Sequence, residues 1–192
     1  MKLLQNLLPM AVAFLPMTSA LPQAEMIQHA ELDSPPPSLV YNNPVGGPGG
    51  SDFSDIGASS ETIDTLHLWV GDAFGHNIVL RGLQITWSSN RESTVYGQKT
   101  NEYRSFKFRP GETIQEMQIA GALGADSISF RTTSRSFFFG GPGGKTVTMN
   151  VGSGILVGFQ GGAGRAIDRL GAIFVQVPDT KVEAAQCMDC NE

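Results

Sequence analysis

Apolar residues recur at every second position over much of the chain, and glycine, serine and asparagine separate the apolar runs. In one run, Leu66, Leu68 and Val70 alternate with His67 and Trp69. Period two puts alternate side chains on the two faces of a β-strand, and no such run has the 3.6-residue period of a helix. The same alternation is found over residues 78–87, 106–108, 128–132, 147–149 and 173–177. The pattern predicts an all-β fold of roughly ten or more short strands.

The alternation changes phase within one of these runs. Ile78 and Leu80 precede Gly82, whereas Leu83 and Ile85 follow it at positions of the opposite parity. One extra residue in a strand of an antiparallel pair produces such a change of phase. We therefore expect a β-bulge close to Gly82.

Glycine accounts for 23 residues, and much of it stands in clusters between the apolar runs. The sequence Gly-Gly-Pro-Gly-Gly occurs at residues 46–50 and again at 140–144, and Gly-Gly-Ala-Gly at 161–164 is a looser copy. Such clusters mark turns, and their recurrence indicates that a hairpin unit is repeated within the fold. The aromatic run Phe137–Phe139, just before the second cluster, and Trp87 are expected to contribute buried surface.

The third cluster leads to a single carboxylate, that of Asp168, and apolar runs flank the whole segment. Gly161, Gly162 and Gly164 have no side chains to cover their backbone N–H groups, which are therefore open to a ligand. A carboxylate accepts hydrogen bonds from two neighbouring hydroxyls. Backbone donors beside one acidic acceptor suit a polyol. In the alternative interpretation, Asp168 only accepts hydrogen bonds from the N–H groups of its own turn.

The G-x-x-x-D sequence from Gly164 to Asp168, followed by an apolar residue, a glycine and a closing strand, resembles the sugar-binding end of jacalin-related lectins of the mannose-binding type. The cluster at 46–50, with Phe53 and acidic residues close behind, resembles the opening of the same domain. The resemblance covers roughly residues 44–177. It implies a β-prism I fold, in which three four-stranded antiparallel sheets are related by pseudo-threefold symmetry.

The resemblance also implies a carbohydrate-binding site that needs no cofactor and no metal. In that site, Asp168 would accept hydrogen bonds from two sugar hydroxyls. The backbone N–H groups of Arg165 and Ala166 would donate to sugar oxygens. Gly164 opens this loop, and Gly50 would donate from the other glycine loop.

The resemblance leaves two classes of glycan open. Galactose preference in the family goes with a cleaved chain that frees a glycine amine, whereas this chain runs unbroken through residues 46–50, which favours mannose or glucose. Family sites often place an aromatic ring near the sugar, but none lies between Gly164 and Asp168 or in the loop Gly121–Gly124. Arg165 lies there instead and would redirect the site toward acidic glycans.

Other chemistry finds little support in the sequence. Gly140–Thr146 has the closing residues of a phosphate-binding P-loop, but its first glycine is missing and a strand pattern follows in place of a helix. The carboxylate pairs Asp52 with Asp55 and Glu112 with Glu116 fit solvated turn or strand positions. We expect neither an enzyme nor a metal site, since the three histidines are scattered.

The formal net charge of -5, with the cations dispersed, also disfavours nucleic-acid binding. The alternative to a lectin is a β-prism interaction or structural module that has lost sugar binding. The sequence leaves open whether the protein forms a homo-oligomer.

The N-terminal end differs from the rest of the chain. Residues 1–20 combine a positive start at Lys2, an apolar run over 3–15 and small residues at the end, which predicts a secretory signal peptide and an extracellular protein. Residues 21–43, which include Pro35–Pro37, predict a flexible proline-rich leader. Whether this leader is a pro-segment stays open.

The lectin domain is expected over residues 44–178, followed by a tail over 179–192. No run in either part approaches transmembrane length, so no membrane insertion is expected. Both cysteines, Cys187 and Cys190, lie in the tail. In a secreted tail they favour a local disulfide, with an interchain disulfide or free thiols as alternatives.

The signal-peptide prediction can be tested by N-terminal sequencing. The exported protein should begin near Leu21, because signal peptidase cleaves after small residues such as those of Thr18–Ala20. Cleavage removes one lysine and no acid, which changes the formal charge from -5 to -6. Recovery of intact chains that begin with Met1 in the cytosol would show that both the export and the disulfide predictions are wrong.

Overall fold

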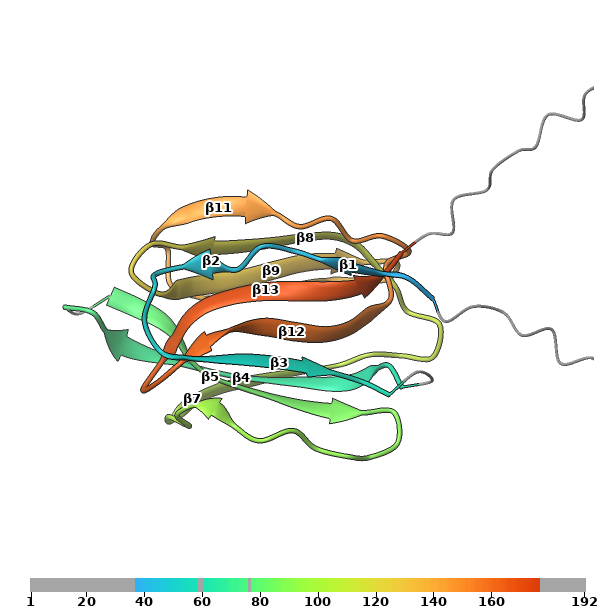
Figure 1. The fold of residues 1–192 in the computed structure, drawn as a ribbon, viewed down its shortest axis with the longest axis horizontal. Coiled ribbons are helices and arrows are strands. Elements are labelled where there is room, and N and C mark those ends of the chain that lie inside the picture. The colour runs from blue at the N-terminus through green and yellow to red at the C-terminus, as the bar shows by residue number, and fades with distance from the viewer. Residues whose placement is uncertain (1–36, 59–60, 76, 177–192) are drawn as a thin grey trace, which may run out of the picture. The chain divides into compact units, whose positions relative to one another are not determined.

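The structure, a computed structural model, describes residues 37–58, 61–75 and 77–176. The predicted signal peptide, most of the predicted leader, Cys187 and Cys190 lie outside these ranges. The described part of the chain is all-β, as predicted (Figure 1). Within the described ranges, no helix has the length and hydropathy that crossing a bilayer requires.

The strands follow one another along the chain as antiparallel hairpins and short edge segments. They are β1 (Leu39–Tyr41), β2 (Val45–Gly46), β3 (Ser51–Ile56), β4 (Ile63–Ala73), β5 (Asn77–Trp87), β6 (Tyr96–Gly97), β7 (Glu102–Lys107), β8 (Ile114–Gly121), β9 (Ala125–Thr132), β10 (Ser136–Gly140), β11 (Lys145–Thr148), β12 (Leu156–Ala163) and β13 (Ile167–Val175).

These strands form three antiparallel sheets. Two sheets have four strands each, in the orders β10-β9-β8-β11 and β6-β5-β4-β7. In the third, β12 and β13 are central, β3 forms one edge, and the short strands β1 and β2 both pair with β13 at the other edge. The third sheet is therefore also four strands wide. Three sheets of this width confirm the predicted β-prism architecture.

A long hairpin forms the centre of each sheet: β4 with β5, β8 with β9, and β12 with β13. All three hairpins turn at the same end of the prism, at the left in Figure 1. The glycine loops between β2 and β3 and between β10 and β11 lie at this end too. We call it the hairpin end.

The core lies where the inner faces of the three sheets meet. The fully buried side chains there include Trp87 of β5, Phe159 of β12, Phe174 of β13 and Met117 of β8. The predicted burial of Trp87 is thereby confirmed. Each sheet buries alternate side chains, which explains the period of two in the sequence. The aromatic run of β10 meets its prediction at two of three positions, because Phe137 and Phe139 pack against the core, whereas Phe138 is 54% exposed.

The predicted bulge is present in the pairing of β4 with β5. The register shifts between Trp69, opposite Gly82, and Val70, opposite Leu80. Arg81 is therefore the extra residue. A bulge bends its strand and redirects a side chain.

The folded part begins earlier than the predicted boundary at Pro44. Strand β1 starts at Leu39, inside the segment predicted as leader, and pairs with the end of β13. Asn42 fixes the following turn, because its side chain donates to the Ala172 carbonyl at 3.0 Å and accepts from the Asn150 N–H at 2.7 Å. Strand β1 extends the sheet by pairing with β13, and the composition of this segment does not reveal that contact.

Phe130 and Phe138 provide a matched test of this core. The ring of buried Phe130 packs 4.9 Å from that of Phe106 and 5.0 Å from that of Phe137. Phe130→Ala should lower the free energy of unfolding by about 3–5 kcal/mol, because it leaves a cavity. Phe138→Ala should change it by less than about 0.5 kcal/mol, because that ring faces solvent. Chemical denaturation of both variants measures the difference, and equal losses would contradict the packing.

Candidate functional site

A hollow of about 430 Å³ opens at the hairpin end between the β12–β13 hairpin, the β4–β5 hairpin and the loop before β3. All five binding residues predicted from the sequence line it, and we call it the Asp168 hollow. Those residues are Gly50, Gly164, Arg165, Ala166 and Asp168. Residues more than 110 positions apart in the sequence thus meet at one place, as the family resemblance implied.

Asp168 is the second residue of β13 and is held from its backbone and its side chain. Its carbonyl accepts a hydrogen bond from the Gly47 N–H at 2.8 Å. Its carboxylate lies against the glycine loop: a Cβ on Gly49 would come within 2.4 Å of Oδ1, and one on Gly50 within 2.5 Å of Oδ2. Gly50 also has a φ of +73°, which disfavours any side chain. Gly49 and Gly50 are therefore glycines because the carboxylate occupies the space of their missing side chains, whereas side chains at Gly46 and Gly47 would meet backbone atoms.

Asp168 as a whole residue is only 9% exposed, which is less than expected of a residue next to a loop. In the described part of the chain, no N–H group of its own turn donates to it. The turn closes instead through the Gly164 N–H, which donates to the Ala166 carbonyl at 3.0 Å. The alternative role as a brace for its own loop therefore has no support in the geometry.

Donors lie beside this acceptor. The backbone N–H groups of Gly50, Arg165 and Ala166 have no hydrogen-bond acceptor among the described residues. Ala166 is buried, whereas Gly50 and Arg165 are exposed and open to the solvent side of the hollow. Three free donors around one free carboxylate form a site that a ligand with several hydroxyls can complete.

Arginines brace both walls of the hollow. Arg81, placed by the bulge of β5, donates from Nε to the Arg165 carbonyl at 3.0 Å and from Nη2 to the Gln98 side chain at 2.8 Å. Arg169 of β13 donates to the Gly49 carbonyl and pairs with Asp52. An arginine side chain therefore holds each of the two loops that line the hollow.

Sequence reasoning missed the contribution of the β4–β5 hairpin, which supplies Asp72, Ala73, Phe74 and Arg81 to the lining. Phe74 has a φ of +47° and an exposed ring. It supplies the aromatic side chain that the G-x-x-x-D loop lacks. The phase shift at Gly82 predicted the bulge, but not that the bulged Arg81 would reach a loop 84 residues further along.

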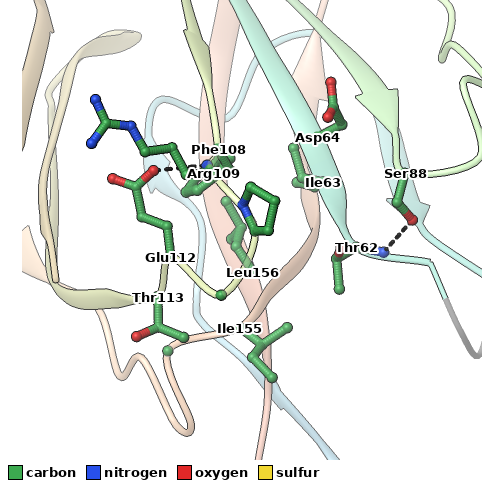
Figure 2. Close-up of a pocket in the computed structure, with 13 residues that line it drawn as sticks. Thr62, Ile63, Asp64, Ser88, Phe108, Arg109, Glu112, Thr113, Ile155 and Leu156 are labelled. Atoms are coloured by element: carbon green, nitrogen blue, oxygen red, sulfur yellow. Dashed lines mark hydrogen bonds between the residues drawn. The ribbon is translucent and has the colours of Figure 1, made fainter. Parts of the chain in front are cut away.

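A second hollow, of about 390 Å³, lies at the other end of β12, around Ile63, Phe108 and Leu156 (Figure 2). Its lining is mainly apolar, and its acidic groups already have partners. Glu112 accepts from the Arg109 N–H at 2.9 Å, drawn in Figure 2, and from Arg135 at 3.1 Å. This hollow therefore has no free carboxylate for a polyol.

The other candidate side chains are also engaged in hydrogen bonds or ion pairs within the fold. His67 bonds Tyr103 at 2.7 Å and Thr86 at 2.9 Å, and burial lowers its pKa. Asp52 pairs with Arg169, and Asp55 accepts from the Tyr96 hydroxyl at 3.0 Å. Across residues 37–58, 61–75 and 77–176, no group of three or more His, Cys, Asp or Glu side chains could hold a metal ion.

The comparisons with known proteins agree with this geometry. The family profile described as the jacalin-like lectin domain matches residues 42–173. The chain is also similar to the crystal structure of a lamprey immune protein, with 31% identity and a TM-score of 0.64. That match covers 74% of this chain but only 45% of the lamprey protein. No curated protein sequence matches significantly.

Plant lectin structures share the fold at lower identity. A mannose-binding jacalin-related lectin from Ananas comosus matches with 22% identity and a TM-score of 0.61, over 72% of this chain and 99% of the lectin. A mannose-specific jacalin-related lectin from Morus nigra, solved with mannose, matches with 18% identity and a TM-score of 0.57, over 72% and 94% of the two chains.

The hydrogen bonds of Glu112 at the second hollow lead to a prediction about how stability depends on pH. Contacts with Arg135, Ser134 and Thr132 outweigh burial and lower the pKa of Glu112 to about 2 from 4.5. Because the folded-state pKa is depressed, the stabilisation is complete above pH 4.5 and disappears as the pH falls toward 2. Glu112→Gln should therefore destabilise the protein at neutral pH, by up to about 3 kcal/mol.

The loss caused by Glu112→Gln should shrink between pH 4.5 and 2, as urea denaturation at several pH values would measure. Glu116→Gln is the matched control, since that carboxylate is half exposed and lies 3.8 Å from Arg131. Exposed pairs of this kind contribute little. A loss for Glu112→Gln that is constant over this pH range would contradict the assignment.

Proposed function

Because the chain belongs to the jacalin-like lectin domain family, we propose that it binds carbohydrate in the Asp168 hollow. One observation carries the proposal: Asp168, a largely buried residue whose carboxylate has no partner among the described residues, lines the same hollow as three residues whose backbone N–H groups have no acceptor there. Neighbouring hydroxyls on a sugar ring are both donors and acceptors, so they match both kinds of group.

The binding mode follows from the positions of these groups. Two neighbouring hydroxyls donate to the two oxygens of Asp168, and the N–H groups of Arg165 and Ala166 donate to sugar oxygens on one side. The Gly50 N–H donates from the opposite loop. Hydrogen bonds to a charged acceptor are roughly twice as strong as neutral ones. The ring of Phe74 offers an apolar surface to the C–H groups of the sugar.

We propose a mannose- or glucose-type ligand. Galactose preference in the family goes with a chain cleaved at this loop, whereas this sequence is continuous through the loop between β2 and β3, which supports the mannose or glucose class. The structural neighbours from Ananas comosus and Morus nigra are described as mannose-binding and mannose-specific lectins. The competing ligand class is an acidic glycan, which the cationic side chains of Arg81 and Arg165 at the rim would attract.

We also propose that the protein acts outside the cell, as a non-catalytic binder of glycans. The signal-peptide pattern of residues 1–20 supports export. A shallow, hydrated sugar site gives weak affinity, so useful binding requires several sites that act together. Multivalency of this kind arises from repeated sites within one chain or from assembly of several chains.

The proposal is tested by Asp168→Asn, which keeps the shape of the side chain but removes its charge and one acceptor oxygen. Binding of a glycan identified on a glycan array should fall at least about tenfold, or roughly 1.4 kcal/mol. The melting temperature should not fall, because the carboxylate has no partner in the fold. Calorimetric titration and thermal unfolding give the two readouts.

Glu116→Gln serves as the control, since it removes a carboxylate on the outer face of β8 and should leave binding unchanged. The array also decides between neutral and acidic glycans. A lower melting temperature with unchanged binding would show that Asp168 only braces its turn. If the wild-type protein bound nothing on a broad array, the lectin function would be wrong and an interaction module would take its place.

A further inference from the structure

The pseudo-threefold symmetry of the prism places a second carboxylate in the same setting as Asp168. Asp126 is the second residue of β9, as Asp168 is of β13. Its carbonyl accepts from the Gly141 N–H at 2.9 Å, just as the Asp168 carbonyl accepts from the Gly47 N–H at 2.8 Å. The two aspartates therefore hold the two Gly-Gly-Pro-Gly-Gly loops in the same way.

The glycine loops around the two aspartates also match in conformation. The φ values are +135° and +134° at Gly46 and Gly140, and +73° at both Gly50 and Gly144. A Cβ on Gly144 would come within 2.3 Å of Asp126 Oδ2, as one on Gly50 would with Asp168 Oδ2 at 2.5 Å. Glycine is required at both positions for the same steric reason.

The hairpin turns correspond residue by residue. In the β8–β9 turn, the Ala122 N–H donates to the Gly124 carbonyl at 3.0 Å, which matches the bond from Gly164 to Ala166. Both hairpins have a register shift one pair before the turn. The N–H groups of Leu123 and Gly124, which correspond to Arg165 and Ala166, have no acceptor among the described residues.

The buried carboxylate of Asp126 lacks a hydrogen-bond partner. The residue is only 4% exposed, and its Oδ2 has no hydrogen-bond partner in the described structure. Burial without compensation also raises the pKa of this carboxyl. The carboxylate lines a hollow of about 120 Å³, together with Gly143, Gly144, Leu123 and Phe74. An unpaired buried carboxylate is costly, so its presence beside an open hollow indicates a ligand.

We propose that the Asp126 hollow is a second carbohydrate site, which accepts two neighbouring hydroxyls of a neutral sugar. The choice of ligand rests on the proposed function of the Asp168 hollow, whereas the location rests on the geometry of Asp126. Leu123, which is 64% exposed, takes the place of Arg165, so the second site has an apolar rim. It is also smaller, which limits it to one terminal sugar residue.

The third symmetry-related position lacks these features and is an internal control. Arg81 takes the place of the aspartate in the third sheet, since its carbonyl accepts from the Gln98 N–H at 2.7 Å, just as the Asp126 carbonyl accepts from the Gly141 N–H. The loop that follows β6 reads Gln-Lys-Thr-Asn at residues 98–101, where the other two loops read Gly-Pro-Gly-Gly. Phe74 lies between the two proposed sites and lines both hollows. The carboxylates of Asp168 and Asp126 would thus accept hydrogen bonds from sugars bound on either side of this one aromatic ring.

Nuclear magnetic resonance can distinguish the sites within the intact protein. Methyl α-mannoside, titrated into ¹⁵N-labelled wild-type protein, should give two saturable sets of amide shifts. One set should include Gly50 and Arg165, and the other Gly144 and Leu123, with no shifts at Gln98–Asn101. Asp126→Asn should abolish only the second set and raise the melting temperature, because it removes a buried charge without a partner.

The outcomes separate this inference from the proposed function. Shifts at the Asp168 set alone would overturn the second site and leave the proposed function intact. Shifts at the Asp126 set alone, lost in Asp126→Asn and kept in Asp168→Asn, would support the second site and overturn the first. No shift at either set, at concentrations that saturate weak sugar sites, would overturn both.

Discussion

The structure depends on one constraint: each of its three sheets has only one face to bury. A single twisted sheet of four short strands cannot enclose its apolar side chains, and three such sheets can do so only by facing a common axis. The fully buried side chains of Trp87, Phe159, Phe174 and Met117 come from all three sheets and meet there. In the closed prism the three hairpin turns lie at the same end. Closure brings the loops of the candidate sites close together, and hydrogen bonds from Arg81, Arg169 and the Gly47 N–H then hold them.

The glycine loops leave room for an aspartate side chain that the closed prism places against them. An aspartate at the second position of a returning strand points toward the loop of the neighbouring edge strand. Where that loop is Gly-Gly-Pro-Gly-Gly, the carboxylate fits against bare backbone, and a Cβ at Gly49 or Gly50 would collide with it. Where the third sheet carries Arg81 instead, the corresponding loop, Gln98–Asn101, has ordinary side chains. Aspartate and glycine loop therefore occur together because each is sterically compatible only with the other.

Much of the fold and half of the Asp168 hollow could be predicted from the sequence. Period-two alternation is a local signal, and it correctly indicated the strands, the bulge near Gly82 and the all-β class. The repeat of the glycine loop and the G-x-x-x-D sequence pointed to Gly50 and Asp168. Phe74 and Arg81 could not be predicted in this way, because they reach the site from a different sheet and carry no motif. The burial of Asp168 was also missed, since a loop sequence gives no sign of how closely a neighbouring loop packs.

Buried carboxylates are paired at one end of the prism and unpaired at the other. The paired ones stabilise the fold, whereas the unpaired ones are available to a ligand. At the far end, Glu112 has every oxygen engaged by Arg135, Thr132, Ser134 or backbone N–H groups, so its charge stabilises the fold. At the hairpin end, Asp126 and Asp168 are also buried; Oδ2 of Asp126 has no partner, and no described group donates to the carboxylate of Asp168. A buried charge without a partner costs several kcal/mol at most sites. A fold whose core and far end are well satisfied can tolerate that cost, and the unsatisfied carboxylates then keep their full hydrogen-bonding capacity for a ligand. Hydroxyl groups of a sugar supply the missing donors, so binding relieves the cost that folding leaves in place.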